Sequence, residues 1–97
     1  MNIFENCELN NEKPAVLKIK DTAKSNTIAI GLKKDQVLKK HVTPFPALLF
    51  VISGSIAFDM EGTTTELNYG DTFEIPVNVP HEVTGLEESI FVVVKEK

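Results

Sequence analysis

The chain has no stretch with helical periodicity, and this constrains its fold more than any other feature. Its apolar residues come in short runs, separated by segments that contain Gly, Pro, Asn or Asp. Such runs are typical of β-strands, and the segments between them are typical of turns. The pattern predicts strands over residues 15–20, 27–33, 47–53, 55–61, 64–69, 72–75, 82–86 and 89–94.

Strands this short and this evenly spaced favour an all-β barrel or sandwich, because closure removes exposed strand edges. A chain of 97 residues has the usual size of one domain, so we expect residues 1–97 to form a single domain. Residues 1–14 are rich in Asn and Glu, and we expect this N-terminal segment to be loosely ordered.

The segment ALLFVIS, residues 47–53, is apolar on both faces of its predicted strand. Alternate residues share a face, which gives two rows: Ala47, Leu49 and Val51 in one, and Leu48, Phe50 and Ile52 in the other. Both rows need cover, and no predicted helix provides it. A second copy of the chain is the simplest cover, so we expect a homodimer. The alternative is that the sheets and loops of one barrel cover both rows.

The segment GDTFEIPVNVPH, residues 70–81, contains a motif with chemical content. The spacing of Gly70, Pro76, Asn78 and His81 resembles the second conserved motif of the cupins. In that motif a glycine, a proline, a second glycine and a metal-binding histidine fall at the same intervals. Asn78 stands where the second glycine is usual.

A first cupin motif would lie upstream, with two histidines, a glutamate and a closing glycine. The segment HVTPFPALLFVISG keeps this spacing from His41 to Gly54. Thr43 stands in the place of the second histidine, and Ala47 stands in the place of the glutamate. The resemblance implies a double-stranded β-helix (jelly-roll) barrel whose motif residues line a cavity.

The set of metal ligands that the resemblance implies is incomplete. A catalytic transition metal usually has at least three protein ligands, and only His41 and His81 remain here. The hydroxyl of Thr43 stays protonated at neutral pH, and Ala47 offers no donor atom. We therefore expect no tightly bound metal cofactor. The alternative is one divalent transition metal ion held by His41 and His81, with a third ligand from a bound small molecule or another strand.

The face that continues from the motifs is otherwise apolar. By parity it contains Ala47, Leu49, Val51, Phe73, Ile75 and Val83. An apolar pocket with a few polar groups is the usual form of a small-molecule site. We expect a small organic ligand there, with the imidazoles as hydrogen-bond donors. The predicted ligand-binding residues are His41, Thr43, Phe45, Ala47 and His81. Phe45 has a second interpretation, as a side chain that packs on the rim between two prolines.

These observations favour a small-molecule-binding protein with a sensor or accessory role rather than an enzyme. One alternative is a metal-dependent cupin enzyme, a dioxygenase or an isomerase, that uses His41 and His81. Another is a structural or protein-binding module whose own side chains fill the cavity.

Charge and hydropathy exclude other classes of partner. All ten basic residues are lysines spread along the chain, and the net charge is −4, so nucleic acid is a poor candidate. No apolar run approaches the roughly 20 residues of a membrane span, and no secretory signal is recognisable. We expect a cytoplasmic protein with no membrane partner. The single cysteine, Cys7, is expected to be an inert thiol.

Overall fold

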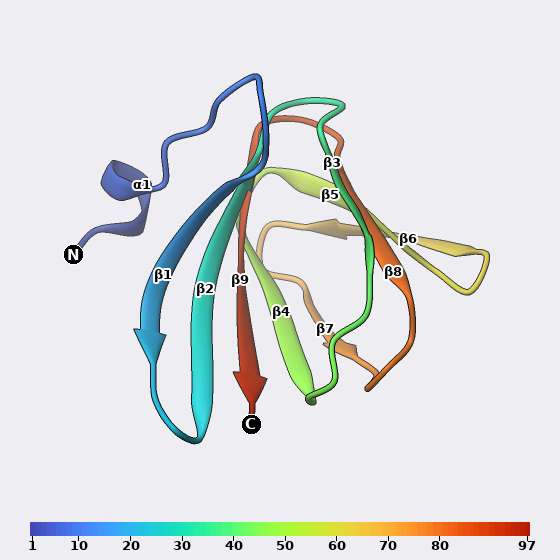
Figure 1. Cartoon of the computed structure of the whole chain (residues 1–97). Coiled ribbons are helices and arrows are strands. Elements are labelled where there is room, and N and C mark those ends of the chain that lie inside the picture. The colour runs from blue at the N-terminus through green and yellow to red at the C-terminus, as the bar shows by residue number, and fades with distance from the viewer.

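The computed structural model describes all 97 residues as two antiparallel β-sheets that face each other, with one short helix (Figure 1). The elements are α1 (Ile3–Asn6), β1 (Ala15–Asp21), β2 (Ser25–Leu32), β3 (Val37–His41), β4 (Ala47–Ser53), β5 (Ser55–Met60), β6 (Thr63–Asn68), β7 (Thr72–Ile75), β8 (His81–Gly85) and β9 (Ser89–Glu96). One sheet has the order β1-β2-β9-β4-β7, and the other has the order β3-β8-β5-β6. The all-β jelly-roll architecture predicted from the sequence is confirmed.

All eight predicted strands are present, with bounds that differ by at most two residues. The structure adds β3, which the sequence did not predict. Its residues VLKKH are mostly exposed and do not alternate between apolar and polar types, so the sequence shows no strand pattern there. The strand is held by pairing with β8, in which Leu38 lies opposite Val83 and His41 lies opposite His81.

The core lies between the two sheets and joins the inward faces of both. Its buried members are Ile30, Leu32, Ala47, Leu49, Val51, Ile56, Phe58, Leu67, Ile75, Val83, Phe91 and Val93. The inward row predicted from parity is therefore correct: five of its residues belong to this core, and Phe73 packs against it. Two sheets packed in this way enclose the space in which the motif residues meet.

Three backbone positions of the cupin-like motifs, Gly54, Gly70 and Asn78, adopt a left-handed conformation. Gly54 has a φ of +77°, and a Cβ there would lie 2.3 Å from the carbonyl oxygen of Glu88, so only glycine fits. Asn78 has a φ of +60°, a conformation that asparagine tolerates better than most residues. The replacement of the usual glycine by Asn78 therefore preserves the turn.

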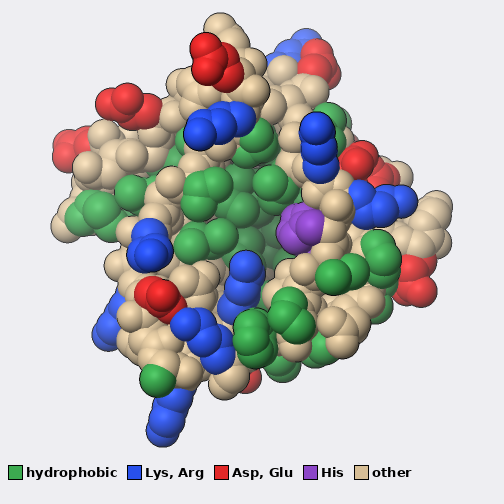
Figure 2. Space-filling model, viewed as in Figure 1, with side chains coloured by type: hydrophobic (Ala, Val, Ile, Leu, Met, Phe, Trp, Pro, Cys, Tyr) green, Lys and Arg blue, Asp and Glu red, His purple; other side chains and the backbone are tan.

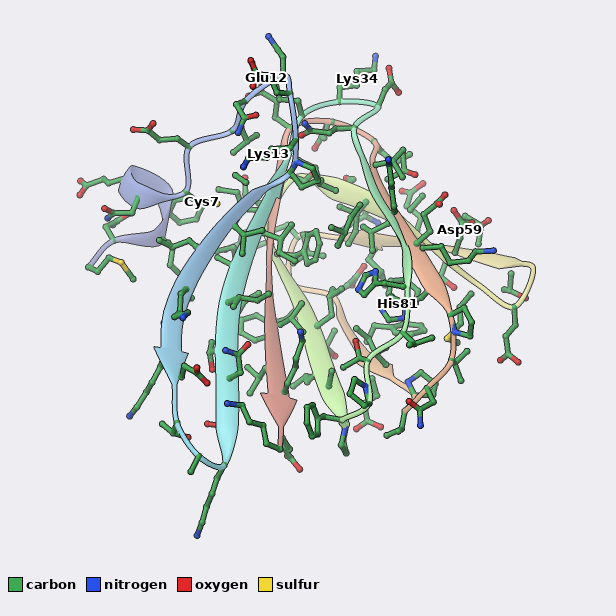
Figure 3. All side chains as sticks on the ribbon, viewed as in Figure 1. Cys7, Glu12, Lys13, Lys34, Asp59 and His81 are labelled. Carbon is green, nitrogen blue, oxygen red and sulfur yellow. The ribbon has the colours of Figure 1, made fainter.

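The N-terminal segment packs on the outer face of the five-stranded sheet. Cys7 is only 4% exposed, and Cys7 and Leu9 lie against Gly31 of β2. Figure 3 shows the labelled Cys7 just after α1, on the side of the segment that faces β1. Burial raises the pKa of the Cys7 thiol, which favours the unreactive protonated form. The segment thus packs against the sheet through Cys7 and Leu9, and its looser order stays a prediction.

This segment also covers part of the outer apolar surface. Phe50 and Ile52 pack against the cluster that contains Cys7, whereas Leu48 remains 39% exposed. The sequence analysis found no helix that could cover this row and left cover by loops of the same chain as the alternative; the N-terminal segment provides part of that cover. Helix α1 is four residues long, and no helix has the length and apolar character needed to cross a membrane.

Candidate ligand-binding site

A cavity of about 190 Å³ lies between the two sheets. Most of its wall is apolar, and the polar side chains that reach it are His41, Thr43, His81 and Lys95. The apolar residues of the wall are Val16, Ile28, Ile30, Leu38, Leu49, Phe58, Ile75, Val83, Phe91 and Val93. The motif spacing predicts that His41, Thr43 and His81 share one space, and the structure places all three around this cavity. Their role in binding stays a prediction.

The two histidines are neighbours across the β3–β8 ladder. Their ring centroids are 4.3 Å apart, with an interplanar angle of 61°. His81 is 2% exposed and stacks on Phe58 at 5.4 Å, whereas His41 is exposed at the rim. Figure 3 shows the labelled His81 beside β3 and β8, on the side of the space between the sheets.

Backbone carbonyl groups fix the hydrogen-bonding roles of both imidazoles. Nδ1 of His41 lies 2.9 Å from the carbonyl oxygen of Lys39, and Nδ1 of His81 lies 3.0 Å from that of Val79. A carbonyl oxygen can only accept, so each Nδ1 carries the proton and donates it. In the neutral ring Nε2 is then an acceptor. The sequence analysis expected these imidazoles to act as donors, and the structure reverses that role for the neutral rings.

Burial keeps His81 neutral. Desolvation is the main cause that lowers the pKa of His81 below its ordinary value of 6.5, and electrostatic interactions with His41 and Lys95 lower it further. The hydrogen bond to the Val79 carbonyl acts in the opposite direction, with a smaller effect. At pH 7 the cavity therefore contains an uncharged His81 whose Nε2 can accept a hydrogen bond.

Thr43 is held in place by its backbone rather than by its side chain. Its carbonyl oxygen accepts a hydrogen bond of 2.9 Å from the backbone N–H of Asn78, which ties the β3–β4 loop to the β7–β8 loop. Thr43 is 3% exposed, yet its hydroxyl makes no hydrogen bond within the protein, and no fully buried side-chain polar atom lacks a partner. The hydroxyl is therefore free to bind a ligand in the cavity.

Lys95 is the site residue that the sequence analysis missed. It lies near the end of β9, in the same alternation as the inward-facing Phe91 and Val93, and it is half-buried at the cavity. Parity along "FVVVK" was the signal that could have found it, because residues two apart in a strand share a face. Lys95 makes no ion pair; the one salt bridge of the chain joins Lys97 to Asp21.

The other two predicted site residues lie beside the cavity rather than on its wall. Phe45, 37% exposed, lines an adjoining pocket of about 220 Å³ that shares His41, Thr43 and Lys95 with the cavity. Ala47 is buried in the core but borders an open depression on the β4–β7 side. Figure 2 shows an apolar hollow in the centre of the face, with a histidine at its edge and lysines around it.

Comparison with protein families gives one match, to the cupin domain, over residues 30–95. The matched region runs from the inward residues of β2 to Lys95 and includes both motifs. The chain belongs to the cupin family. No curated protein matches this cupin significantly.

Solved structures share the fold over almost the whole chain. An RmlC-like cupin from Desulfovibrio desulfuricans has a TM-score of 0.89 and 17% identity, with 99% of this chain and 93% of that chain covered. An uncharacterised double-stranded β-helix protein from Klebsiella pneumoniae has a TM-score of 0.89 and 25% identity, with coverage of 99% and 87%. KdgF from Halomonas sp. has a TM-score of 0.81 and 18% identity, with coverage of 89% and 82%. These similarities establish the double-stranded β-helix fold.

The residues of this cupin do not fit a catalytic metal ion. No group of three or more His, Cys, Asp or Glu side chains is close enough to hold one. The two imidazole Nε2 atoms are suitable donors, since a metal-binding histidine commonly donates its other ring N–H to a carbonyl group. Thr43 and Ala47 add no anionic ligand, however, and the ammonium group of Lys95 opposes a second positive charge.

Proposed function

We propose that this cupin binds a small organic ligand in its barrel cavity, without a tightly held metal ion, in a sensor or accessory role. The observation that carries the proposal is the distribution of polar groups around the cavity. Four polar side chains come together on an otherwise apolar wall, and the hydroxyl of Thr43 and the ammonium of Lys95 have no partner within the protein. Such a wall is typical of small-molecule sites.

Both alternatives have less support. A metal-dependent dioxygenase or isomerase would need a third protein ligand, and the side chains around His41 and His81 supply none. A purely structural barrel would be filled by its own side chains, whereas this barrel keeps a cavity with room for about six water molecules at ~30 Å³ each.

We also propose that the chain forms a homodimer through the outer face of β4. The half-exposed Leu48 lies opposite Val94 in the ladder, and both residues border an open depression of about 640 Å³ with Val77. The N-terminal segment packs on the same outer face, farther along the sheet, over β2. A second copy would cover the apolar surface that the segment leaves open.

Filling the cavity tests ligand binding. In Val83→Phe, a larger side chain would occupy the space beside His81, and Val37→Phe, at an exposed position of β3 outside the cavity wall and the proposed dimer face, is the matched control. Small molecules released by denaturing the purified proteins would be identified by mass spectrometry, and a compound library would be screened by thermal shift. A ligand at 100 times its Kd stabilises a protein by about 2.7 kcal/mol.

We expect released compounds, or stabilising compounds from the library, with the wild type and with Val37→Phe, and their loss with Val83→Phe. Circular dichroism would establish that both variants are folded. Equal binding by a folded Val83→Phe would contradict the proposal, as would a wild type that releases no compound and is stabilised by none.

A further inference from the structure

We propose that Lys95 supplies the positive charge at the centre of this site and that the ligand is a small monocarboxylic acid with an apolar tail. The carboxylate would bind the ammonium group of Lys95 and the hydroxyl of Thr43, and the tail would occupy the barrel. This inference rests on the proposed function and specifies its ligand.

The position of Lys95 explains why the ammonium group is available. In the β4–β9 ladder Lys95 lies opposite Ala47, the position at which the family pattern has a glutamate. A glutamate at residue 47 would be a direct cross-strand partner for Lys95. Ala47 has no group that could pair with the ammonium, so the exchange of the carboxylate for a methyl group leaves a free positive charge beside the cavity.

No other acidic group of the site compensates that charge. Neither the cavity nor the adjoining pocket is lined by an Asp or a Glu, and Lys95 forms no salt bridge. Lys95 is half-buried, so its ammonium has lost part of its hydration. A carboxylate from the ligand would restore a charge-assisted hydrogen bond, which is stronger than a bond between neutral groups.

The arrangement of polar and apolar walls fixes the orientation of the ligand. His41, Thr43 and Lys95 line both the barrel cavity and the adjoining pocket, so these three residues form the neck between the two spaces. Beyond the neck, His81 is the remaining polar residue of the wall. A molecule with one charged end and one apolar end matches this distribution, with its charged end at the neck. The volume of about 190 Å³ limits the tail to a short chain.

The charges of the neck favour a monoanion over a phosphate. Lys97 also lines the outer pocket, but its ammonium is paired with Asp21. The neck therefore offers one free positive charge and one hydroxyl donor. The chain has no arginine for bidentate phosphate binding, and the Nδ1–H of each imidazole already donates to a backbone carbonyl group.

Isovalerate and isovaleramide are suitable probes, because they share the same tail and differ in charge. Binding of each would be measured by calorimetry and by ¹H–¹⁵N NMR at pH 7.5 for the wild type, Lys95→Met, Lys95→Arg and Lys97→Met. Methionine keeps the apolar stem of Lys95 without its charge, and Lys97→Met removes the neighbouring lysine that is already paired.

We expect isovalerate to bind Lys95→Met at least about tenfold more weakly than the wild type, since one charge-assisted interaction is lost. Lys97→Met should stay within about twofold of the wild type, and Lys95→Arg should bind more tightly than Lys95→Met. Isovaleramide should bind the wild type and Lys95→Met equally and more weakly than isovalerate binds the wild type.

Equal affinity of isovalerate for the wild type and Lys95→Met would overturn the assignment of Lys95. Equal affinity of the wild type for the acid and the amide would overturn the choice of a carboxylic acid. In both cases binding at the cavity would leave the proposed function intact. If neither probe shifts the NMR signals of residues around the cavity, the acid-binding inference is wrong, and the cavity-filling experiment then decides the proposed function separately. Should Lys95→Met fail to fold, the same comparison is made with Lys95→Gln.

Discussion

The two ends of β9 differ in whether the polar groups around them have partners within the protein. At its start, Ser89 is 1% exposed; its hydroxyl oxygen accepts from the N–H of Ser55, and its single proton is shared between the carbonyl oxygens of Ser55 and Glu87, each 2.8 Å away. At its other end, Lys95 has no counter-ion, and Thr43 of the β3–β4 loop, which lines the same cavity, is 3% exposed with a hydroxyl that has no partner within the protein. We call the first the closed end, because its hydroxyl is fully hydrogen-bonded. We call the second the open end, because its hydroxyl and its ammonium group have no partner within the protein. A buried polar group with all its partners has a structural role, whereas a polar group that faces a cavity without a protein partner can bind water or a ligand.

The largest expected effect is the conversion of the open end into a metal site. Thr43→His with Ala47→Glu restores the two ligands that the family pattern has and this chain lacks. Because Lys95 lies opposite residue 47, its ammonium would pair with the new glutamate and oppose the metal ion. We expect the triple variant that also carries Lys95→Met to hold about one divalent ion per chain.

Elemental analysis after nickel-free purification and titration with Mn²⁺, Fe²⁺ and Zn²⁺ would measure this gain. The double variant that retains Lys95 should bind at least about tenfold more weakly than the triple variant. The wild type should hold far less than one equivalent. A folded triple variant that stays metal-free in excess metal would show that positions 43 and 47 do not aim at a common centre.

The closed end should contribute much more to stability than the open end. Ser89→Ala removes the partner of both the N–H and the carbonyl group of Ser55, so we expect a loss of about 3 kcal/mol in the free energy of unfolding. Thr43→Val keeps the shape of the side chain and removes a hydroxyl without a partner, so we expect a change below about 1 kcal/mol. Urea denaturation would measure both. A loss for Thr43→Val as large as that for Ser89→Ala would refute the distinction between the two ends.

A substitution on the outer face of the five-stranded sheet tests the proposed homodimer. The half-exposed Leu48 lies on the apolar surface that the N-terminal segment leaves uncovered, so Leu48→Glu should place a charge in the dimer interface. We expect monomers or aggregates in light scattering at micromolar concentration. Thr63→Glu, which adds the same charge on an exposed position of β6, should remain dimeric. A monomeric wild type would rule out the dimer.

The smallest expected effect is a change of the free energy of unfolding with pH, caused by His81. Its folded-state pKa lies below its ordinary value of 6.5, so below that pH the unfolded chain binds a proton that the folded chain does not. Stability should therefore fall as the pH decreases below about 6.5, with a slope from this group of at most about 1.4 kcal/mol per pH unit, and the contribution should level off below the folded-state pKa.

His41 and Lys95 both face His81, and their electrostatic interactions with it lower its pKa in the same direction as burial. Unfolding by urea between pH 5.5 and 7.5 would measure the slope. His81→Gln should be less pH-dependent than the wild type over this range. Identical slopes for the two proteins would show that His81 is not the group responsible.

Much of the fold could be predicted from local pattern. Residue alternation gave the inward row of Leu49, Val51 and Val83, and the motif spacing placed His41, Thr43 and His81 at one cavity. These predictions succeeded because side-chain direction along a strand has a period of two, which is a local property of the backbone.

Other features could not be predicted from local pattern. Strand β3 has exposed lysines and no alternation, and its partner β8 is about 40 residues away in the sequence. The burial of Cys7 depends on contact with Gly31 of β2, which composition does not reveal. In both cases a long-range contact stabilises a segment that has little preference of its own.

The sequence by itself determined which side chains share a face, which turns accept a left-handed residue, and which ligands of the family pattern are missing. The tertiary structure decided which neighbours and hydrogen-bond partners those side chains have. It set Lys95 opposite Ala47, turned the Nδ1 atoms of both histidines toward carbonyl groups, and left the hydroxyl of Thr43 free. The physical reason is that hydrogen-bond partners and burial depend on strands distant in sequence, so the chemistry of the cavity exists only once β3, β4, β8 and β9 are brought together.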